Sequence, residues 1–232
     1  MITEDRVLYE DNHLIAINKN PGDISQGDKT GDIALTDLVA AFLKKKYEKP
    51  GNVFCGLIHR IDRPVSGATL FAKTSKALER MNKIFHDREV KKTYWAVTKN
   101  PPPQKNMHLV HYMTRNRQQN KSTAHIQEKK ESKKAELDLQ VLASSDNYHL
   151  LELLPLTGRH HQIRAQLTAI GCPIKGDLKY GFPRSNDDAS IHLHARKLEF
   201  IHPVTDEPVT ITAPVPGDKL WKFFEQQVTR VT

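Results

Sequence analysis

Residues 59–67 contain an aspartate whose neighbours suit it for chemistry. The segment reads His-Arg-Ile-Asp-Arg-Pro-Val-Ser-Gly, so Asp62 lies between Arg60 and Arg63. Nearby cations favour the ionised carboxylate, and an ionised aspartate can act as a base or as a nucleophile at neutral pH. Taken alone, such a segment is more often a salt-bridged aspartate in a surface turn.

Residues 157–164 form a second cluster, which reads Thr-Gly-Arg-His-His-Gln-Ile-Arg. We expect Thr157 to cap a helix that begins near Arg159 and runs to about residue 170. Helical spacing would place His160 and Arg164 on one face, at a helix start whose free N–H groups can bind phosphate. A metal site is not expected, because no carboxylate or cysteine stands at ligand spacing and neighbouring helical residues point to different sides.

Basic and aromatic side chains adjoin one another in residues 91–96, which read Lys-Lys-Thr-Tyr-Trp-Ala. Such neighbours suit base stacking combined with phosphate contacts in RNA recognition. Residues 92–99 have the composition of a strand, in which successive side chains point to opposite faces. At least one of Tyr94 and Trp95 therefore belongs to the core.

Positive charge is concentrated in the part of the chain around this strand. The 232 residues include 35 Lys and Arg against 27 Asp and Glu, a net charge of +8. Residues 80–134 hold 14 basic and 4 acidic residues, so this quarter of the chain carries the whole excess. Localised positive charge favours a polyanionic partner, because neutralised phosphates release counterions. A basic face that only keeps the protein in solution would have the same composition.

Composition excludes several classes of protein. Mean hydropathy is −0.58, and no run approaches the roughly 18 apolar residues that span a bilayer. The first residues lack the pattern of a signal peptide. Two cysteines, Cys55 and Cys172, are too few for a disulfide framework or a zinc site. We therefore expect a cytoplasmic, monomeric protein that contacts no membrane.

Short strands and amphipathic helices are expected to position these segments. Thr36 is the expected N-cap of a helix that ends near residue 47, and Ser75 that of a helix that ends near residue 87. A last helix is expected at 218–228. Strands are expected at 7–10, 14–17, 68–72, 92–99, 137–142, 149–154, 191–194, 197–201 and 209–212.

These elements predict one α+β domain over residues 1–232, with a mostly antiparallel sheet and flanking helices. Residues 107–134 are polar and basic, with strand-like pieces at 108–112 and 122–127. This segment is either an ordered hairpin or a mobile arm, and the sequence leaves both open.

Together the three segments resemble the RluA family of pseudouridine synthases. Residues 59–67 look like the family's His-Arg-Leu-Asp…Thr-Ser-Gly motif, residues 92–96 like Lys-x-Tyr-x-Ala, and residues 157–164 like Thr-Gly-Arg-x-His-Gln-Ile-Arg. The resemblance extends over about 7–213, with further matches in family order at 171–174, 176–181, 192–195 and 200–203.

The resemblance implies the pseudouridine synthase catalytic fold, with an active-site cleft across the sheet. Many relatives begin with a small S4-type RNA-binding domain, but none is expected here because the first hairpin of the catalytic fold starts at Val7. It also implies an isomerase that converts uridine in ribosomal or transfer RNA to pseudouridine. That reaction breaks the N1–C1′ bond and joins C5 to C1′ with no net redox change or hydrolysis, so no cofactor or metal is expected.

The family's motifs also assign roles to residues of this chain. Asp62 would be the catalytic carboxylate at a flipped-out nucleotide, Arg164 its ion-pair partner, and Tyr94 the residue that stacks on the uracil. Whether Asp62 attacks the sugar or promotes elimination to a glycal stays open. Contacts with RNA are expected from His59, Arg60, Lys92, Lys129, Lys130 and Arg159.

Some positions depart from the family's pattern. Val65 stands where Thr is usual, Gln166 replaces a common His, and residues 20–22 vary a Lys-Pro-x-Gly loop, so local hydrogen bonding is open. Two other functions are also open. A non-catalytic RNA-binding protein or RNA chaperone could share the fold, and a metal-dependent hydrolase, suggested by 12 histidines, would lose activity with a chelator.

Overall fold

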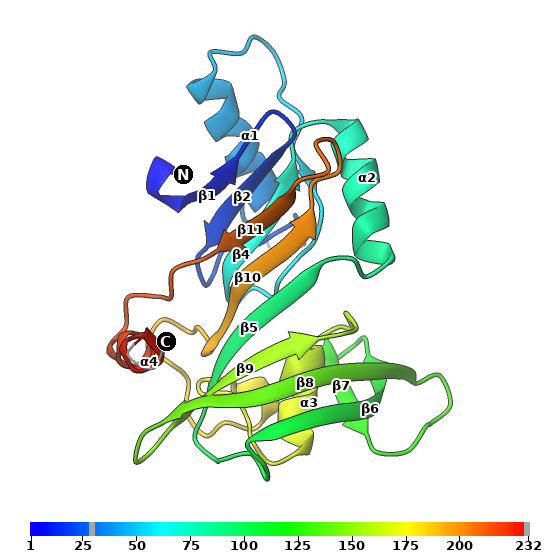
Figure 1. Cartoon of the computed structure of the whole chain (residues 1–232), viewed down its shortest axis with the longest axis vertical. Coiled ribbons are helices and arrows are strands. Elements are labelled where there is room, and N and C mark those ends of the chain that lie inside the picture. The colour runs from blue at the N-terminus through cyan, green and yellow to red at the C-terminus, as the bar shows by residue number, and fades with distance from the viewer. Residues whose placement is uncertain (28–30, 230–232) are drawn as a thin grey trace. The chain divides into compact units, whose positions relative to one another are not determined.

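The computed structural model describes residues 1–27 and 31–229, which divide into two compact units (Figure 1). Unit 1 comprises Met1–Lys91 and Ala195–Pro214, and unit 2 comprises Lys92–His194 and the residues from Val215 on. Each unit is a sheet with helices packed on it. The strand pairs whose register is defined are antiparallel, so the expected α+β class is confirmed.

Unit 1 is built on strands in the order β1-β2-β4-β10-β11, with β3 also paired to β4. Strand β10 belongs to this unit from Ala195 on. The elements are η1 (Glu4–Arg6), β1 (Val7–Glu10), β2 (Leu14–Lys19), α1 (Leu35–Lys46), β3 (Gly56–Leu57), β4 (Ser66–Ala72), α2 (Ser75–His86), β10 (Leu193–Ile201) and β11 (Pro208–Thr212).

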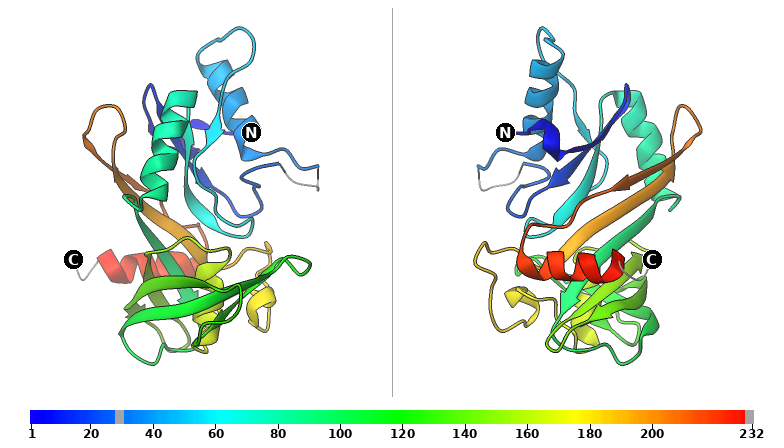
Figure 2. Two further views of the ribbon diagram at one scale, coloured as in Figure 1. Left: turned by 90° about the vertical axis from the view of Figure 1, so that its right-hand side faces the viewer. Right: turned by 60° about the vertical axis from the view of Figure 1, so that its left-hand side comes forward.

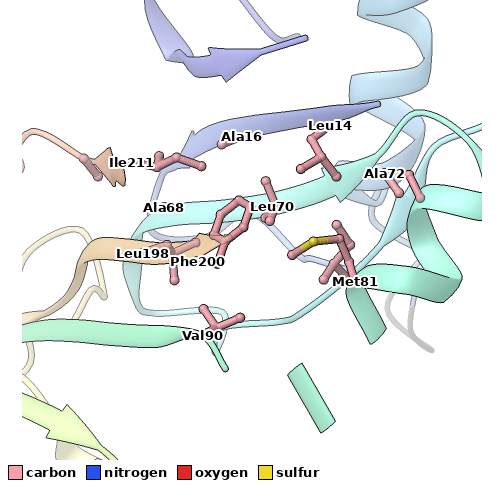
Figure 3. Packing of buried hydrophobic residues seen from close by; sticks show 13 residues of the cluster. Leu14, Ala16, Ala68, Leu70, Ala72, Met81, Val90, Leu198, Phe200 and Ile211 are labelled. Atoms are coloured by element: carbon pink, nitrogen blue, oxygen red, sulfur yellow. The ribbon is translucent and has the colours of Figure 1, made fainter. Parts of the chain in front are cut away.

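Strand β2 is buried on both faces because a helix covers each of them (Figure 2). Leu14 and Ala16 belong to a cluster that includes Met81 of α2. The alternate residues Ile15 and Ile17 pack with α1. Figure 3 shows Met81 directed from α2 toward the strands of its cluster. The two-residue period of a strand thus gives unit 1 one apolar layer on each side of its sheet.

The helix caps of unit 1 differ from those expected. Helix α1 begins after Ala34 rather than Thr36, and the backbone N–H of Leu35 bonds to the carbonyl of Ile24 at 2.7 Å. A distant backbone acceptor thus satisfies a free N–H group of the first turn. Helix α2 is capped by Thr74, not Ser75, since the Thr74 hydroxyl accepts from the Ala77 N–H at 3.2 Å.

Unit 2 has strands in the order β5-β9-β8-β6-β7 (Figure 1). A single strand, β10, replaces the two that were expected at 191–194 and 197–201, and its first two residues belong here. The elements are β5 (Lys91–Thr98), β6 (Asn106–Asn116), β7 (Lys121–His125), β8 (Lys133–Ser144), β9 (His149–Pro155), α3 (Gln162–Ala169), η2 (Leu178–Tyr180) and α4 (Lys219–Thr229).

The basic segment 107–134 is an ordered hairpin followed by a short turn. Strands β6 and β7 pair antiparallel from Tyr112 opposite His125 to Asn116 opposite Lys121. Strand β6 also pairs with β8 along eight positions. Of the two alternatives that the sequence leaves open, the structure has the hairpin.

Helices α3 and α4 cover opposite faces of the unit 2 sheet. Ala135 of β8 packs with Ala165 of α3. On the other face, Trp95 of β5 packs with Trp221 of α4. Trp95 is therefore the core residue of its pair, and Tyr94 on the opposite face is half-buried. The strand alternation in the sequence predicted this division.

Gly67 in β4 lies directly against the backbone of Ala195. Its φ is +116°, and an added Cβ would lie 2.3 Å from the carbonyl oxygen of Ala195. We expect Gly67→Ala to lower the free energy of unfolding by about 2 kcal/mol or more, since both the φ angle and the contact are unfavourable. The control is Gly217→Ala, where a Cβ meets no heavy atom within 4 Å. Urea unfolding compares the two, and equal stabilities would contradict this assignment.

Candidate active site

Asp62 lies in the loop that leads from β3 to β4 of unit 1. Its backbone carbonyl accepts a hydrogen bond from the Val65 N–H at 3.0 Å, so residues 62–65 form a tight turn. The hydroxyl of Ser25 bonds to the carbonyl of Ile61 just before it. Asp62 itself is half-buried. The backbone around the predicted catalytic carboxylate is thus fixed on both sides.

The ammonium group of Lys19 is hydrogen-bonded to the backbone of this turn. Lys19 ends β2, and its side chain is 0% exposed. Its Nζ donates to the carbonyls of Asn20 at 3.1 Å, Arg63 at 3.0 Å and Val65 at 2.8 Å. Three carbonyl acceptors satisfy all three N–H donors of a lysine. Nothing in the local sequence pattern pointed to Lys19.

Lys19 also interacts electrostatically with two acidic side chains near the turn, Asp23 and Asp62. Burial lowers the pKa of Lys19 to about 8, while the nearby carboxylates of Asp23 and Asp62 raise it. The Lys19 ammonium therefore lies close enough to the Asp62 carboxylate for the two charges to interact.

The residues on either side of Asp62 have different environments. The Nε2 atom of His59 accepts from the Leu70 N–H at 3.1 Å, and its ring stacks on Phe85 at 5.0 Å. His59 thus anchors the loop to β4 and α2. Arg60 is exposed. Arg63, which follows Asp62, is exposed and pairs with Asp32 at 2.8 Å.

Helix α3 of unit 2 carries Arg164 and begins later than expected. Its N-cap is His161, in the left-handed region with φ 51°, instead of a residue near Arg159. Thr157 does not cap it, because its hydroxyl donates to the Gln162 side chain at 2.8 Å. The same Gln162 oxygen accepts from the Arg159 N–H at 2.9 Å. The prediction that this helix begins near Arg159 is therefore wrong, because it begins at Gln162.

The two adjacent histidines also differ from the expectation. His160 precedes the helix, so it shares no helical face with Arg164. The rings of His160 and His161 stack at 3.8 Å instead of pointing to different sides. His160 bonds through Nδ1 to the hydroxyl of Ser122 at 2.9 Å and through Nε2 to the side chain of Asn120 at 3.0 Å.

Arg164 forms a two-point ion pair with Asp177 inside unit 2. Its Nε lies 2.7 Å from Oδ2 and its Nη2 lies 2.8 Å from Oδ1 of the carboxylate. The two side chains are 6% and 1% exposed. Asp177 is a partner that the sequence analysis did not anticipate, although it belongs to the matching segment 176–181. The pair compensates a buried guanidinium that would otherwise be very unfavourable.

The remaining predicted RNA-binding residues lie in several places. Lys92 is half-buried in β5, on the same strand as Tyr94. Lys129 and Lys130 are exposed in the turn between β7 and β8, which Ser132 closes through its bond to the Lys129 carbonyl. Arg159 is half-exposed, and its Nε donates to the Lys134 carbonyl at 3.0 Å.

Two of the three departures from the family pattern, Val65 and Gln166, lie buried within their units. The amide nitrogen of the Gln166 side chain lies 3.1 Å from Nδ1 of His111 and 3.3 Å from the Leu109 carbonyl.

In the part of the chain that the structure describes, no three His, Cys, Asp or Glu side chains are grouped to hold a metal ion. None of its helices there has the length and apolar character needed to cross a membrane.

Comparison with known proteins gives one consistent result. Residues 13–169 match the family described as RNA pseudouridylate synthase. Ribosomal large subunit pseudouridine synthase C of Vibrio vulnificus is 31% identical, over 96% of this chain and 69% of that protein. The tRNA pseudouridine synthase C of Haemophilus influenzae is 32% identical, over 95% and 96%. The solved structure of human RNA pseudouridylate synthase domain containing 4 has a TM-score of 0.80 at 24% identity, over 97% and 93% of the two chains.

The depressed pKa of Lys19 predicts a specific dependence of stability on pH. The unfolded chain binds a proton at Lys19 up to about its ordinary pKa of 10.5, whereas the folded chain releases it near 8. Between these values the unfolded state holds more protons, so the contribution of Lys19 to stability rises with pH. We expect Lys19→Met to remove this rise, measured by urea unfolding at pH 7.5 and pH 10.

The exposed lysine Lys76 of α2 provides the control, and Lys76→Met should keep the wild-type difference between the two pH values. An unchanged difference in Lys19→Met would contradict the assignment.

Proposed function

Because this chain belongs to the RNA pseudouridylate synthase family and isomerises uridine in RNA to pseudouridine, we propose that Asp62 is its catalytic carboxylate. The observation that carries this proposal is the family match over residues 13–169, which includes Asp62, Tyr94 and Arg164 in their motifs. The fixed turn around Asp62 supports it, because a reacting group must be held in a defined position.

We further propose that the substrate is a uridine in structured ribosomal or transfer RNA. One similar protein is named for the large ribosomal subunit and another for transfer RNA. The net charge of +10 in residues 80–134 supports a large polyanionic substrate. A single catalytic domain, acting as a monomer in the cytoplasm where these RNAs are found, completes the proposal.

The chemistry assigned to Asp62 follows from the bonds that change. The N1–C1′ bond breaks and a C5–C1′ bond forms. N1 gains a proton and C5 loses one, so the overall reaction is an isomerisation. An ionised carboxylate can stabilise or attack the electron-poor sugar while the base turns. Asp62 is proposed to act at C1′ or C2′ of a nucleotide that has left the helix.

Arg164 and Tyr94 are proposed to complete the site. Asp62 belongs to unit 1 and Arg164 to unit 2, so their ion pair rests on the family motif and is part of the proposal. Tyr94 is half-buried, which suits a ring that stacks on the uracil.

The contacts with the RNA backbone are assigned to basic side chains near the motifs. Exposed cations are suited to binding phosphate. When they neutralise phosphate groups, the RNA releases the counterions that were bound to it, and this release favours binding. The residues proposed for these contacts are His59, Arg60, Lys92, Lys129, Lys130 and Arg159, of which Arg60, Lys129 and Lys130 are exposed.

The competing proposal is a protein of the same fold that binds RNA without catalysis. Such a protein has no need of a carboxylate, an aromatic ring and a guanidinium in their family positions. All three are present as Asp62, Tyr94 and Arg164.

The proposal predicts a clear separation of chemistry from binding in Asp62→Asn. Turnover should fall by about 10³-fold or more, because the reacting carboxylate is lost. Affinity for RNA should stay within about threefold, because an amide has nearly the same shape. Release of tritium from C5-labelled uridine in RNA measures turnover, and filter binding measures affinity.

The matched control for this test is Asp146→Asn, in the exposed turn between β8 and β9. It makes the same chemical change and should leave both quantities unchanged. Near-normal turnover in Asp62→Asn would refute the role of Asp62.

Four lysines in the turn between β7 and β8 and at the start of β8 predict a change in salt dependence. Replacement of Lys129, Lys130, Lys133 and Lys134 by Glu should weaken RNA binding and flatten the plot of log affinity against log salt concentration. Each phosphate contact that is lost should lower the slope by about one. The control makes the same replacement by Glu at Lys44 and Lys45, an exposed pair on α1 outside the basic segment. A wild-type slope in the fourfold variant would show that these four lysines do not contact RNA phosphates.

A further inference from the structure

Tyr180 connects Arg164 to strand β7 of the basic hairpin. It ends the short helix η2 and is 3% exposed. The Cζ atom of Arg164 lies 4.8 Å from the centre of its ring. The edge of the guanidinium is bonded to Asp177, as described above. The arginine is therefore fixed along one edge by a carboxylate and close to the face of an aromatic ring, an arrangement typical of a cation–π contact.

The hydroxyl group of Tyr180 is held by two other segments. It accepts a hydrogen bond from the Ser122 N–H of β7 at 2.9 Å. It also lies 3.0 Å from Nδ1 of His161, the N-cap of α3. The carbonyl of Tyr180 accepts from the Thr168 hydroxyl at 3.0 Å. The ring can therefore move only if the hairpin, the cap of α3 or the body of α3 moves with it.

The same ring lies next to a cation of the hairpin. The Nζ atom of Lys121 is 5.3 Å from the ring centre. Lys121 precedes Ser122 in β7 and belongs to the basic segment that is proposed to follow the RNA backbone. One aromatic side chain thus touches a cation of the proposed RNA track and the proposed partner of the catalytic carboxylate.

From these contacts we propose that Tyr180 is a positioning residue for uridine isomerisation. Its ring orients the Arg164 guanidinium, and its hydroxyl ties that orientation to β7 and to the cap of α3. This inference rests on the proposed function, because Tyr180 acts through Arg164 on Asp62. Its loss should slow the chemical step more than it weakens RNA binding.

Two substitutions separate the ring from the hydroxyl. Tyr180→Phe keeps the ring beside the guanidinium and removes the two hydroxyl contacts. Tyr180→Leu removes the ring as well as the hydroxyl contacts. The measurement is single-turnover conversion with enzyme in saturating excess over RNA. Its rate constant does not depend on the folded fraction of the enzyme, so a merely structural role would leave the rate constant unchanged.

We expect the rate constant to fall by about threefold to tenfold in Tyr180→Phe and by about thirtyfold or more in Tyr180→Leu. Affinity for RNA should stay within about threefold in both. Tyr148→Phe and Tyr148→Leu are the matched controls, since Tyr148 packs in the α4 cluster of the same unit, and both should keep the wild-type rate constant.

Rate constants within twofold of wild type in both Tyr180 variants would overturn the inference, as would a loss of affinity that accounts for the whole effect. If Tyr180→Leu does not fold, the rate constant of Tyr180→Phe decides alone. The proposed function is tested separately, because an active Asp62→Asn enzyme would refute it. An inactive Asp62→Asn with wild-type rates in the Tyr180 variants would refute only the positioning role.

Discussion

Burial of the Arg164 guanidinium is the constraint on which the rest of unit 2 depends. A charge taken out of water is unfavourable by several kcal/mol unless it is paired and hydrogen-bonded. Asp177 supplies that pairing through two short bonds, and Tyr180 covers the guanidinium on its face. These requirements bring together α3, η2 and, through the Tyr180 hydroxyl, the β7 strand. The Arg164 guanidinium is therefore held rigidly, which suits it to stabilise a carboxylate.

Unit 1 meets the same electrostatic problem with a different residue. Lys19 is buried beneath the turn that carries Asp62, and three backbone carbonyls accept its N–H groups. The ammonium thus fixes the turn by hydrogen bonds and places a positive charge near the Asp62 carboxylate. Each unit therefore holds one charged group of the proposed reaction in place. Lys19 fixes the turn that carries Asp62, and Asp177 fixes Arg164. This arrangement costs stability, which the apolar layers on both faces of each sheet offset.

Features that depend on local pattern were predictable from the sequence. Strand alternation predicted that at least one of Tyr94 and Trp95 belongs to the core, and amphipathic periodicity found the helices. Features that depend on distant partners were not. The hydroxyl of Thr157 could cap a helix. It donates instead to the Gln162 side chain and accepts from the Glu136 N–H, and α3 starts later. Lys19 and Asp177 escaped notice because only tertiary contacts reveal a buried cation or its partner. The motif resemblance, by contrast, assigned family and reaction, since it rests on residue identity alone.

The central claim is that a single carboxylate, Asp62, converts uridine to pseudouridine in cellular RNA. Chemical mapping of pseudouridine in total RNA tests it most directly, in cells that lack the gene and in cells complemented with either the wild-type or the Asp62→Asn protein. The account predicts that defined positions in ribosomal or transfer RNA lose pseudouridine without the gene. The wild-type protein should restore them and Asp62→Asn should not. Restoration by Asp62→Asn, or an unchanged map without the gene, would contradict the account.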